Sequence, residues 1–365
     1  MNALLRELRE NRIFWLLVAV PVVLIAEHLA DVSATALFAL SVLAIVPLAA
    51  LLSRATESVA AKTGDAVGGL LNATLGNLTE LVIAITALRA GMMDLVKASI
   101  AGAILTNSLF MLGMALLLGG LRYHTQEYNR VTARLQAGML FLATVALLVP
   151  SAIAMSGRAG ADTVMTKLSV GLAVLLLVAY VLGLLFSLRT HKELFVSAAH
   201  GEGEHEAVWP VGPAVATLAV VTVLVALVSE IFVASVQEAA LAFGMTPAFV
   251  GFIIVALVGA AAEMVTAFSA ARKNRLDLSV SVALGSSSQI ALFVAPVLVL
   301  LSWFIAPTPM DLNFWPWAVV AVMLSTLAVS FVTNSGRSAW YVGVLLLVIY
   351  ATFAIALYLL PPDAR

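Results

Sequence analysis

Two glutamates lie within long apolar stretches of this chain, and the residues around them repeat. Glu80 and Glu263 are 183 residues apart, and this shift superimposes segments 67–102 and 250–285 without a gap. The segments share 12 identities in 36 positions, where composition alone would give roughly 3 or 4. A carboxylate inside a bilayer costs about 2.5–3.5 kcal/mol even on a lenient insertion scale. Two such acids at equivalent places of a duplicated unit therefore indicate a functional role.

The composition is that of an integral membrane protein. The chain is 62% hydrophobic and 11% charged, with a mean hydropathy of +1.08, which is far more apolar than a soluble domain requires. Apolar windows of about 20 residues predict eleven transmembrane helices. They lie near 13–30, 34–53, 68–90, 95–119, 131–153, 166–188, 211–240, 247–271, 278–304, 314–334 and 338–360.

The basic residues predict an orientation for these helices. With the N-terminus in the cytoplasm, fourteen of the 19 lysines and arginines fall in inner segments and five in outer ones. This excess of positive charge on the inner side places the N-terminus in the cytoplasm and the C-terminus outside. The short loops favour a multi-pass protein of a prokaryotic inner (cytoplasmic) membrane.

The repeat and the helix count together predict the domain organisation. Residues 1–30 form a leading helix, 31–189 and 211–365 form two five-helix repeats, and 190–210 form an acidic cytoplasmic linker. Because five crossings separate equivalent helices, the second repeat is inverted relative to the first. The predicted fold class is therefore all-α, with one leading helix and two inverted repeats. Such repeats bring equivalent polar groups together near the bilayer midplane.

The residues before Glu80 are typical of a cation site. Asn72 and Asn77 precede it, and Gly76 weakens the helix so that backbone carbonyls can be exposed. Carboxylate, amide and carbonyl oxygens are the ligands that Ca²⁺ prefers. Two carboxylates can neutralise one divalent cation, and the same pair can take up protons when the cation leaves. A site that holds either species can exchange one for the other.

Further polar residues follow each glutamate at matching depths. Asn107 and Gln289 place an amide at nearly the same level of the two halves. The predicted metal-binding set is Glu80, Glu263, Asn77, Asn107 and Gln289. The secondary candidates are Asn72, Ser286, Ser288 and Glu230. Small polar residues also mediate ordinary helix packing in membranes, and this alternative stays open for the serines. Glu230 lies deep in the predicted span 211–240 and is expected to be embedded in the membrane.

Three long motifs resemble one known family. They are VGGLLNATLGNLTEL (67–81), VSEIFVASVQEA with FVGFIIVALVG (228–239 and 249–259), and KNRLDLSVSVALGSSSQIALF (273–293). They are similar to the Ca²⁺/H⁺ exchangers of the cation/proton exchanger (CAX-type) family, within the Ca²⁺/cation antiporter superfamily. This resemblance implies eleven helices in two inverted repeats, with the two glutamates coordinating Ca²⁺ and exchanging it for protons. It also assigns polar ligands to Asn77, Asn107 and Gln289, and an acidic central loop to 200–206, where a flexible solvated linker is the alternative.

The second motif departs from the family pattern Pro-x-x-Gly-Asn-Ala-Ala-Glu-His. This chain has Ala256, Ala260 and Met264 in place of the proline, the asparagine and the histidine. The second half therefore lacks one amide ligand and a helix-breaking residue, and the helix is expected to bend at Gly259 instead. A Na⁺(K⁺)/H⁺ or mixed-cation antiporter on the same fold is the alternative that this departure leaves open.

Other classes of protein fit the sequence poorly. The chain has no cysteine, no His-Glu-x-x-His and no Gly-x-Gly-Asp, so an enzyme or a bound cofactor is not expected. No long basic run points to nucleic acid. A cation channel would need no inverted duplication. The predicted function is a secondary active antiporter that exports cytoplasmic Ca²⁺ in exchange for protons by alternating access. The sequence does not specify an oligomeric state.

Overall fold

Apolar helices make up nearly all of the computed structural model, which describes residues 11–29, 32–63, 65–155, 161–191 and 209–359. A helix satisfies its own backbone hydrogen bonds, which a bilayer core requires of any segment that crosses it. In chain order the elements are a 3₁₀ helix, η1 (Arg12–Val18), then α2 (Ala19–Ala26), α3 (Ala34–Ala60), α4 (Asp65–Leu75), α5 (Leu78–Arg89), α6 (Met93–Leu105), the π-helical η2 (Thr106–Met111), α7 (Leu112–Tyr123), β1 (Thr125–Glu127), α8 (Arg130–Met155), α9 (Ala161–Leu185) and the π-helical η3 (Phe186–Thr190). The later elements are α11 (Val211–Ala242), α12 (Pro247–Phe249), the π-helical η4 (Val250–Val255), α13 (Ala256–Gly259), α14 (Ala261–Arg272), α15 (Leu276–Gln289), the π-helical η5 (Ile290–Val294), α16 (Ala295–Ile305), α17 (Pro316–Val332), β2 (Arg337–Ala339) and α18 (Trp340–Leu359).

The expected all-helical membrane architecture is confirmed, whereas the count of eleven crossings is met only approximately. Among the described residues, seven helices are long and apolar enough to cross a membrane, and two bent pairs bring this number to nine. The expected spans at 13–30 and 314–334 correspond to shorter apolar helices, Arg12–Ala26 and Pro316–Val332. Each is shorter than the roughly 20 residues of a full crossing.

Both glutamate-bearing helices are broken, and the breaks lie at equivalent places of the repeat. Helices α4 and α5 meet at an angle of 43°, and the segments Val250–Gly259 and Ala261–Arg272 meet at 62°. The bend expected at Gly259 is therefore confirmed. Helices α5 and α14 begin and end at positions related by the shift of 183 residues. The repeat seen in the sequence is thus also a repeat of backbone geometry.

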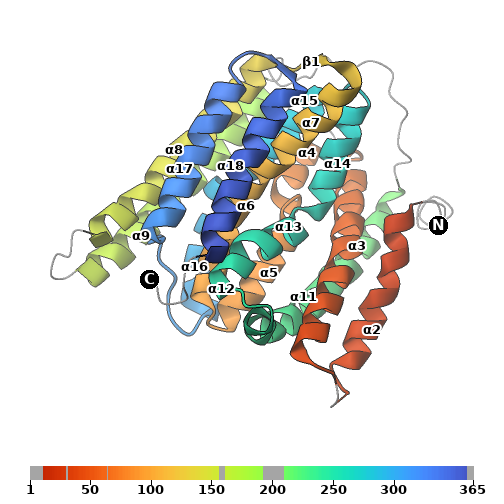
Figure 1. Ribbon diagram of the computed structural model, residues 1–365, viewed down its shortest axis with the longest axis vertical. Helices are drawn as coiled ribbons and strands as arrows, with labels where there is room; N and C mark the ends of the chain where they lie inside the picture. The colour runs from red at the N-terminus through yellow and green to blue at the C-terminus, as the bar shows by residue number, and fades with distance from the viewer. Residues whose placement is uncertain (1–10, 30–31, 64, 156–160, 192–208, 360–365) are drawn as a thin grey trace.

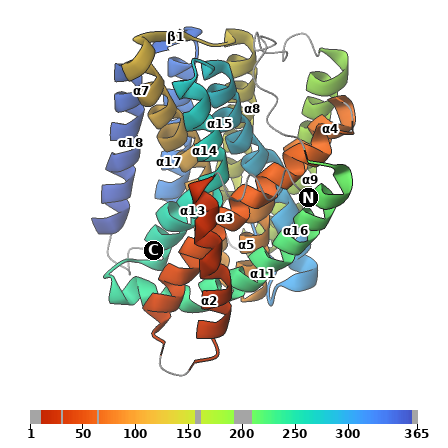
Figure 2. The ribbon, with the colours of Figure 1, turned by 90° about the vertical axis from the view of Figure 1, so that its right-hand side faces the viewer.

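The glutamate-bearing helices lie in the middle of the molecule. Figure 1 shows α13 and α14 between a group at the right, α2 and α3, and a group at the left that contains α8, α17 and α18. Helices α3 and α11 pack along one another, with the rings of Phe38 and Phe232 stacked 5.2 Å apart. In the view of Figure 2, α2 extends to the end opposite β1.

A short antiparallel pair of strands ties the two repeats together at one end. Strands β1 and β2 pair with Gln126 opposite Ser338. The Gln126 side chain is 2% exposed and donates hydrogen bonds to the carbonyl of Ala271 at 3.0 Å and to Asn274 Oδ1 at 2.9 Å. The first repeat therefore holds the turn between α14 and α15, where Asn274 adopts a left-handed conformation with φ 60°.

Candidate cation site

Glu80 lies in the first turn of α5, immediately after the break between α4 and α5. Its Oε1 atom is buried and has no hydrogen-bond partner among the described residues. A methyl group added at Gly259 would lie 2.9 Å from Glu80 Cγ and 3.5 Å from Oε1. The carboxyl group of the first repeat is therefore packed directly against the helix break of the second repeat.

Glu263 occupies the equivalent position in the first turn of α14. Its Oε2 atom is also buried without a partner in the described part of the chain. The Ser286 hydroxyl lies beside the carboxyl group of Glu263. Glu80 packs against Gly259, which precedes Glu263 by four residues on the same broken helix. Each glutamate lies at the N-terminal end of a half-helix, where the helix dipole favours negative charge.

A chain of amide and hydroxyl groups from both repeats lies beside the acids. Asn77 donates to Gln289 Oε1 at 2.5 Å and accepts from the Ser286 hydroxyl at 3.0 Å. The Asn107 amide in turn donates to Ser286 Oγ at 2.8 Å. Asn77 and Asn107 are fully buried, and Asn107 Oδ1 is another buried oxygen with no partner among the residues described. The network connects α5, η2 and α15.

These groups can hold a hard cation or protons. Three buried oxygens without partners, on Glu80, Glu263 and Asn107, are an energetic liability unless a donor or a cation reaches them. Among the described residues, no three histidine, cysteine, aspartate or glutamate side chains are placed together so that they could hold a metal ion. The two carboxylates would therefore need neutral oxygens from amides, hydroxyls, carbonyls or water to complete the six to eight ligands that Ca²⁺ takes.

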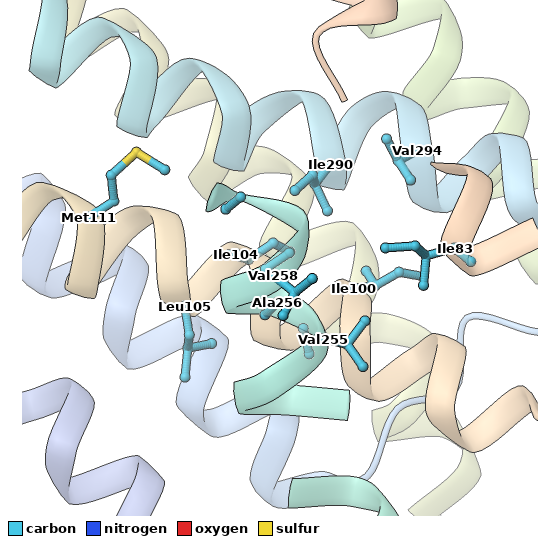
Figure 3. Packing of buried hydrophobic residues seen from close by; sticks show 14 of the residues in the cluster. Ile83, Ile100, Ile104, Leu105, Met111, Val255, Ala256, Val258, Ile290 and Val294 are labelled. Atoms are coloured by element: carbon cyan, nitrogen blue, oxygen red, sulfur yellow. The ribbon is translucent and has the colours of Figure 1, made fainter. Parts of the chain in front are cut away.

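One end of the site is closed by apolar side chains. The cavity beyond Glu80 is lined, apart from Glu80 and Ser99, by apolar residues, namely Ile83, Ala84, Ile100, Ala103, Val255, Ala256, Ile290 and Val294. Figure 3 shows Ile83 and Ile100 beside one another, with Val255, Ile290 and Val294 around them. An ion that moved along such a lining would lose its water without gaining polar partners, so this side is unfavourable for ion passage.

The other end opens into a large vestibule. A pocket with about 500 Å³ of room for water reaches Asn72 on α4 and, on α14, Ala262 and Thr266, which lie on either side of Glu263 in the chain. Charged residues of the pocket include Lys273 and the ion pair between Arg54 and Glu57, at 3.4 Å. The vestibule opens near the turn between α14 and α15, and its lining reaches Ala262, the residue before Glu263.

The secondary candidates are placed differently from the five predicted ligands. Asn72 is exposed in the vestibule, outside the amide network. Ser288 donates to the carbonyls of Leu284 and Gln136, so its hydroxyl faces α8. Ser286 alone of the secondary set joins the network.

Glu230, expected to lie within the membrane span, is placed away from the central network. Its side chain is 58% exposed and lies 3.9 Å from Arg89. Both residues line a separate pocket of about 940 Å³ between α5 and α11. Glu80 lies in the first turn of α5 and Arg89 is its last residue. At 1.5 Å per residue, Arg89 and its partner Glu230 therefore lie roughly 13 Å along α5 from Glu80. The loop 200–206 lies outside the described residues.

Sequence reasoning missed two tyrosines and a glutamine near the site. The Tyr350 hydroxyl lies 3.3 Å from Thr106 Oγ1, and the Tyr180 hydroxyl donates to the carbonyl of Ala73 just before the first helix break. Gln136 projects from α8 toward α15, and its Oε1 is buried without a partner among the described residues. A glutamine within the predicted span 131–153 was a signal that the sequence did contain.

Comparison with known proteins identifies the family. The family model described as sodium/calcium exchanger protein matches residues 33–189 and 213–359. The Ca²⁺/H⁺ antiporter of Synechocystis sp. is 42% identical over 367 residues, covering 96% of this chain and 98% of that protein. The Ca²⁺/H⁺ antiporter ChaA of Bacillus subtilis is 40% identical over 354 residues, covering 96% of this chain and all of that one, at 100%.

Solved structures show the same fold. The structure of native YfkE matches with a TM-score of 0.82 and 36% identity, covering 95% of this chain and 100% of that chain. The H⁺/Ca²⁺ exchanger CAX matches with a TM-score of 0.72 at 16% identity, over 95% of this chain and 92% of that chain, and at this identity it supports the fold alone. With a family model that covers most of the chain, and with relatives and a solved structure aligned over nearly its full length, this membrane-embedded protein belongs to the sodium/calcium exchanger protein family.

Proposed function

We propose that the protein is a secondary active antiporter that exchanges Ca²⁺ for protons at the paired glutamates. The observation that carries this proposal is the equivalent placement of Glu80 and Glu263 at two helix breaks, each with a buried carboxyl oxygen that lacks a partner in the described structure. The names of relatives at about 40% identity, Ca²⁺/H⁺ antiporters, support the choice of Ca²⁺ and H⁺ as the exchanged ions.

The proposed ligands are the two acids with Asn77, Asn107 and Gln289, and Ser286 as a hydrogen-bonding partner. Asn77 and Gln289 now satisfy one another across the repeats. A cation would draw their oxygen atoms toward it and replace that bond. When the cation leaves, protons on the carboxyl groups remove their mutual repulsion. Occupancy by one species or the other keeps the buried site neutral.

Exchange requires that the site open to one side at a time. The vestibule on one side of Glu263 and the apolar closure beyond Glu80 support an alternating-access cycle in which one bundle moves against the other. The distribution of basic residues supports a cytoplasmic N-terminus and an outer C-terminus, which makes the vestibule cytoplasmic. In an inner membrane, the cycle would then export Ca²⁺ and admit protons. The two-part match at 33–189 and 213–359 supports a division into two five-helix repeats.

A second candidate is a Na⁺(K⁺)/H⁺ or mixed-cation antiporter, and one observation favours it. Ala260, at the equivalent of Asn77, is fully buried and begins α14 without a side-chain ligand. The second repeat therefore contributes fewer oxygens than the first. A site with fewer oxygen ligands has a weaker preference for Ca²⁺ over monovalent cations such as Na⁺ and K⁺.

Uptake of ⁴⁵Ca²⁺ into proteoliposomes with an imposed pH gradient tests the proposal. Wild type should accumulate Ca²⁺ only when the gradient is present, and Glu80→Gln and Glu263→Gln should each abolish uptake, because an amide keeps the shape but can neither carry charge nor release a proton. Glu230→Gln is the matched control, since Glu230 is exposed and distant from the network, and it should retain uptake. Movement of Na⁺ or K⁺ without Ca²⁺ would instead establish the second candidate.

A further inference from the structure

We propose that the interface between α8 and α15 carries a water-filled route for protons, separate from the vestibule that admits the cation. The inference rests on the proposed Ca²⁺/H⁺ exchange and specifies the path that one of its two ions takes. It is based on a polar cavity, a stripe of polar residues on one face of α15 and a buried amide oxygen.

A second polar cavity opens near the same end of the bundle as the vestibule. It leaves about 30 Å³ of room for water between α8 and α15, and it is lined by Tyr128, Asn129, Thr132, Ala133, Gln136, Asp277, Val280 and Ser281. Six of these side chains carry oxygen or nitrogen. A cavity of this kind, with several polar partners for each solvent molecule, is a place where water is stable.

The polar residues of α15 form a stripe on the face that the cavity borders. Asp277, Ser281 and Ser288 are four and seven residues apart, a spacing that places them on one side of a helix. The vestibule, in contrast, contacts α15 through Leu278 and Val282. Helix α15 therefore separates two approaches to the site.

Gln136 connects the cavity to the inner end of this stripe. The Gln136 Nε2 atom lies 3.4 Å from both the backbone carbonyl and the hydroxyl of Ser281. The backbone carbonyl of Gln136 accepts a hydrogen bond from the Ser288 hydroxyl at 3.1 Å. The Gln136 Oε1 atom is buried without a partner among the described residues. A buried carbonyl left in this state costs about 1–3 kcal/mol, which a water molecule in the cavity would offset.

The path ends beside the acids. Ser288 faces Gln136, whereas the next residue, Gln289, accepts from Asn77 in the network of the cation site. One residue along α15 thus separates the contact with Gln136 from the contact with Asn77. In the proposed route, waters in the cavity pass the proton on, each O–H bond breaking as the next one forms, and the carboxylate of Glu80 or Glu263 takes it up.

The cavity suits protons rather than Ca²⁺. Its titratable side chains are Asp277 and Tyr128, and the Asp277 carboxylate already accepts from the backbone amide of Asn129. One carboxylate does not neutralise a divalent cation that takes six to eight oxygen ligands. A chain of waters needs only hydrogen-bonding groups, which six of the side chains that line the cavity supply.

The test separates proton coupling from cation exchange in purified, reconstituted protein. One assay measures ⁴⁵Ca²⁺ uptake driven by a pH gradient, with a pH dye recording proton efflux. The other measures exchange of ⁴⁵Ca²⁺ for unlabelled Ca²⁺ at equal pH, which moves no net protons. Asp277→Asn keeps a hydrogen-bond acceptor for Asn129, and Gln136→Leu makes the cavity apolar. Each should slow proton-driven uptake on the order of tenfold while Ca²⁺/Ca²⁺ exchange stays at the wild-type rate.

The matched control is Asp277→Glu, which retains the carboxylate and should retain coupled uptake. If Asp277→Asn and Gln136→Leu leave both assays unchanged, or slow both equally, the separate route is wrong. If wild type shows no proton-coupled Ca²⁺ movement at all, it is the proposed Ca²⁺/H⁺ exchange that fails.

Discussion

At Gly259 the absence of a side chain is part of the site. Any larger residue would bring a carbon within 2.9 Å of Glu80 Cγ, a separation too short for two carbon atoms. The same position breaks the helix that leads to Glu263. One small residue therefore positions both acids, the first by contact and the second through the bend.

Gly259→Ala should weaken Ca²⁺ binding without unfolding the protein. The added methyl group displaces the Glu80 carboxyl at a cost of about 1–3 kcal/mol, which corresponds to roughly a tenfold rise in the Ca²⁺ concentration for half-maximal uptake. The measurement is the Ca²⁺ dependence of proton-driven uptake. Gly138→Ala on α8 is the control, because a methyl group there meets nothing within 4 Å. An unchanged Ca²⁺ dependence in Gly259→Ala would contradict the packing argument.

At the scale of elements, the inverted repeat explains how two half-helices are held. Each turn after a glutamate-bearing helix contains a left-handed residue, Gly91 with φ 74° and Asn274 with φ 60°, again 183 positions apart. The loop of the other repeat contacts each turn: Pro307 packs near Gly91, and Gln126 bonds to Asn274. Each repeat thus fixes the helix that carries the other repeat's acid.

Gln126→Leu should destabilise the protein and leave its substrate preference intact. The substitution removes both hydrogen bonds from Gln126 to the α14–α15 turn, each worth about 0.5–1.5 kcal/mol, while the Ala271 carbonyl keeps the bond that it accepts from the Asn274 amide. The apparent unfolding temperature in detergent should fall, while the Ca²⁺ dependence of the remaining folded protein stays unchanged. Gln237→Leu on the exposed face of α11 is the control and should unfold as wild type does. Equal apparent unfolding temperatures of Gln126→Leu and Gln237→Leu would show that the contact of Gln126 with the turn does not stabilise the fold.

For the whole molecule, the two pockets define which side the site faces. The vestibule lies along α14 as far as the turn that follows it. The pocket at Arg89 lies at the C-terminal end of α5. On the side of Glu80 that faces away from the vestibule, the neighbouring cavity is lined mainly by apolar side chains. The proposed alternating-access cycle therefore predicts that the site exchanges ions through the vestibule at the end with the α14–α15 turn.

Single cysteines can establish this topology without background, because the chain contains none of its own. Ser269→Cys places a thiol in the vestibule, and Ala234→Cys places one in the pocket at Arg89. A membrane-impermeant maleimide should label position 269 only from the cytoplasmic side and position 234 only from the outside. Wild type should remain unlabelled from both sides. The reverse labelling pattern would invert the proposed orientation and the direction of transport with it.

The sequence by itself determined the fold class, the repeat and the residues of the central network. Buried carboxylates and amides are costly in an apolar span, so Glu80, Glu263, Asn77, Asn107 and Gln289 were visible as exceptions against a uniform background. The shift of 183 residues predicted which of them would meet. The bend at Gly259 followed from local helix propensity.

Only the tertiary structure decided which polar residue faces which neighbour. Glu230 and Glu80 look alike as acids in apolar helices, yet Glu230 is exposed beside Arg89 because its helix turns that face away from the core. Ser286 and Ser288 are two positions apart, and a helix directs them to different sides, one to the cation network and the other to Gln136. Sequence supplies the chemical groups, but their directions depend on helix rotation and on packing between segments far apart in the chain.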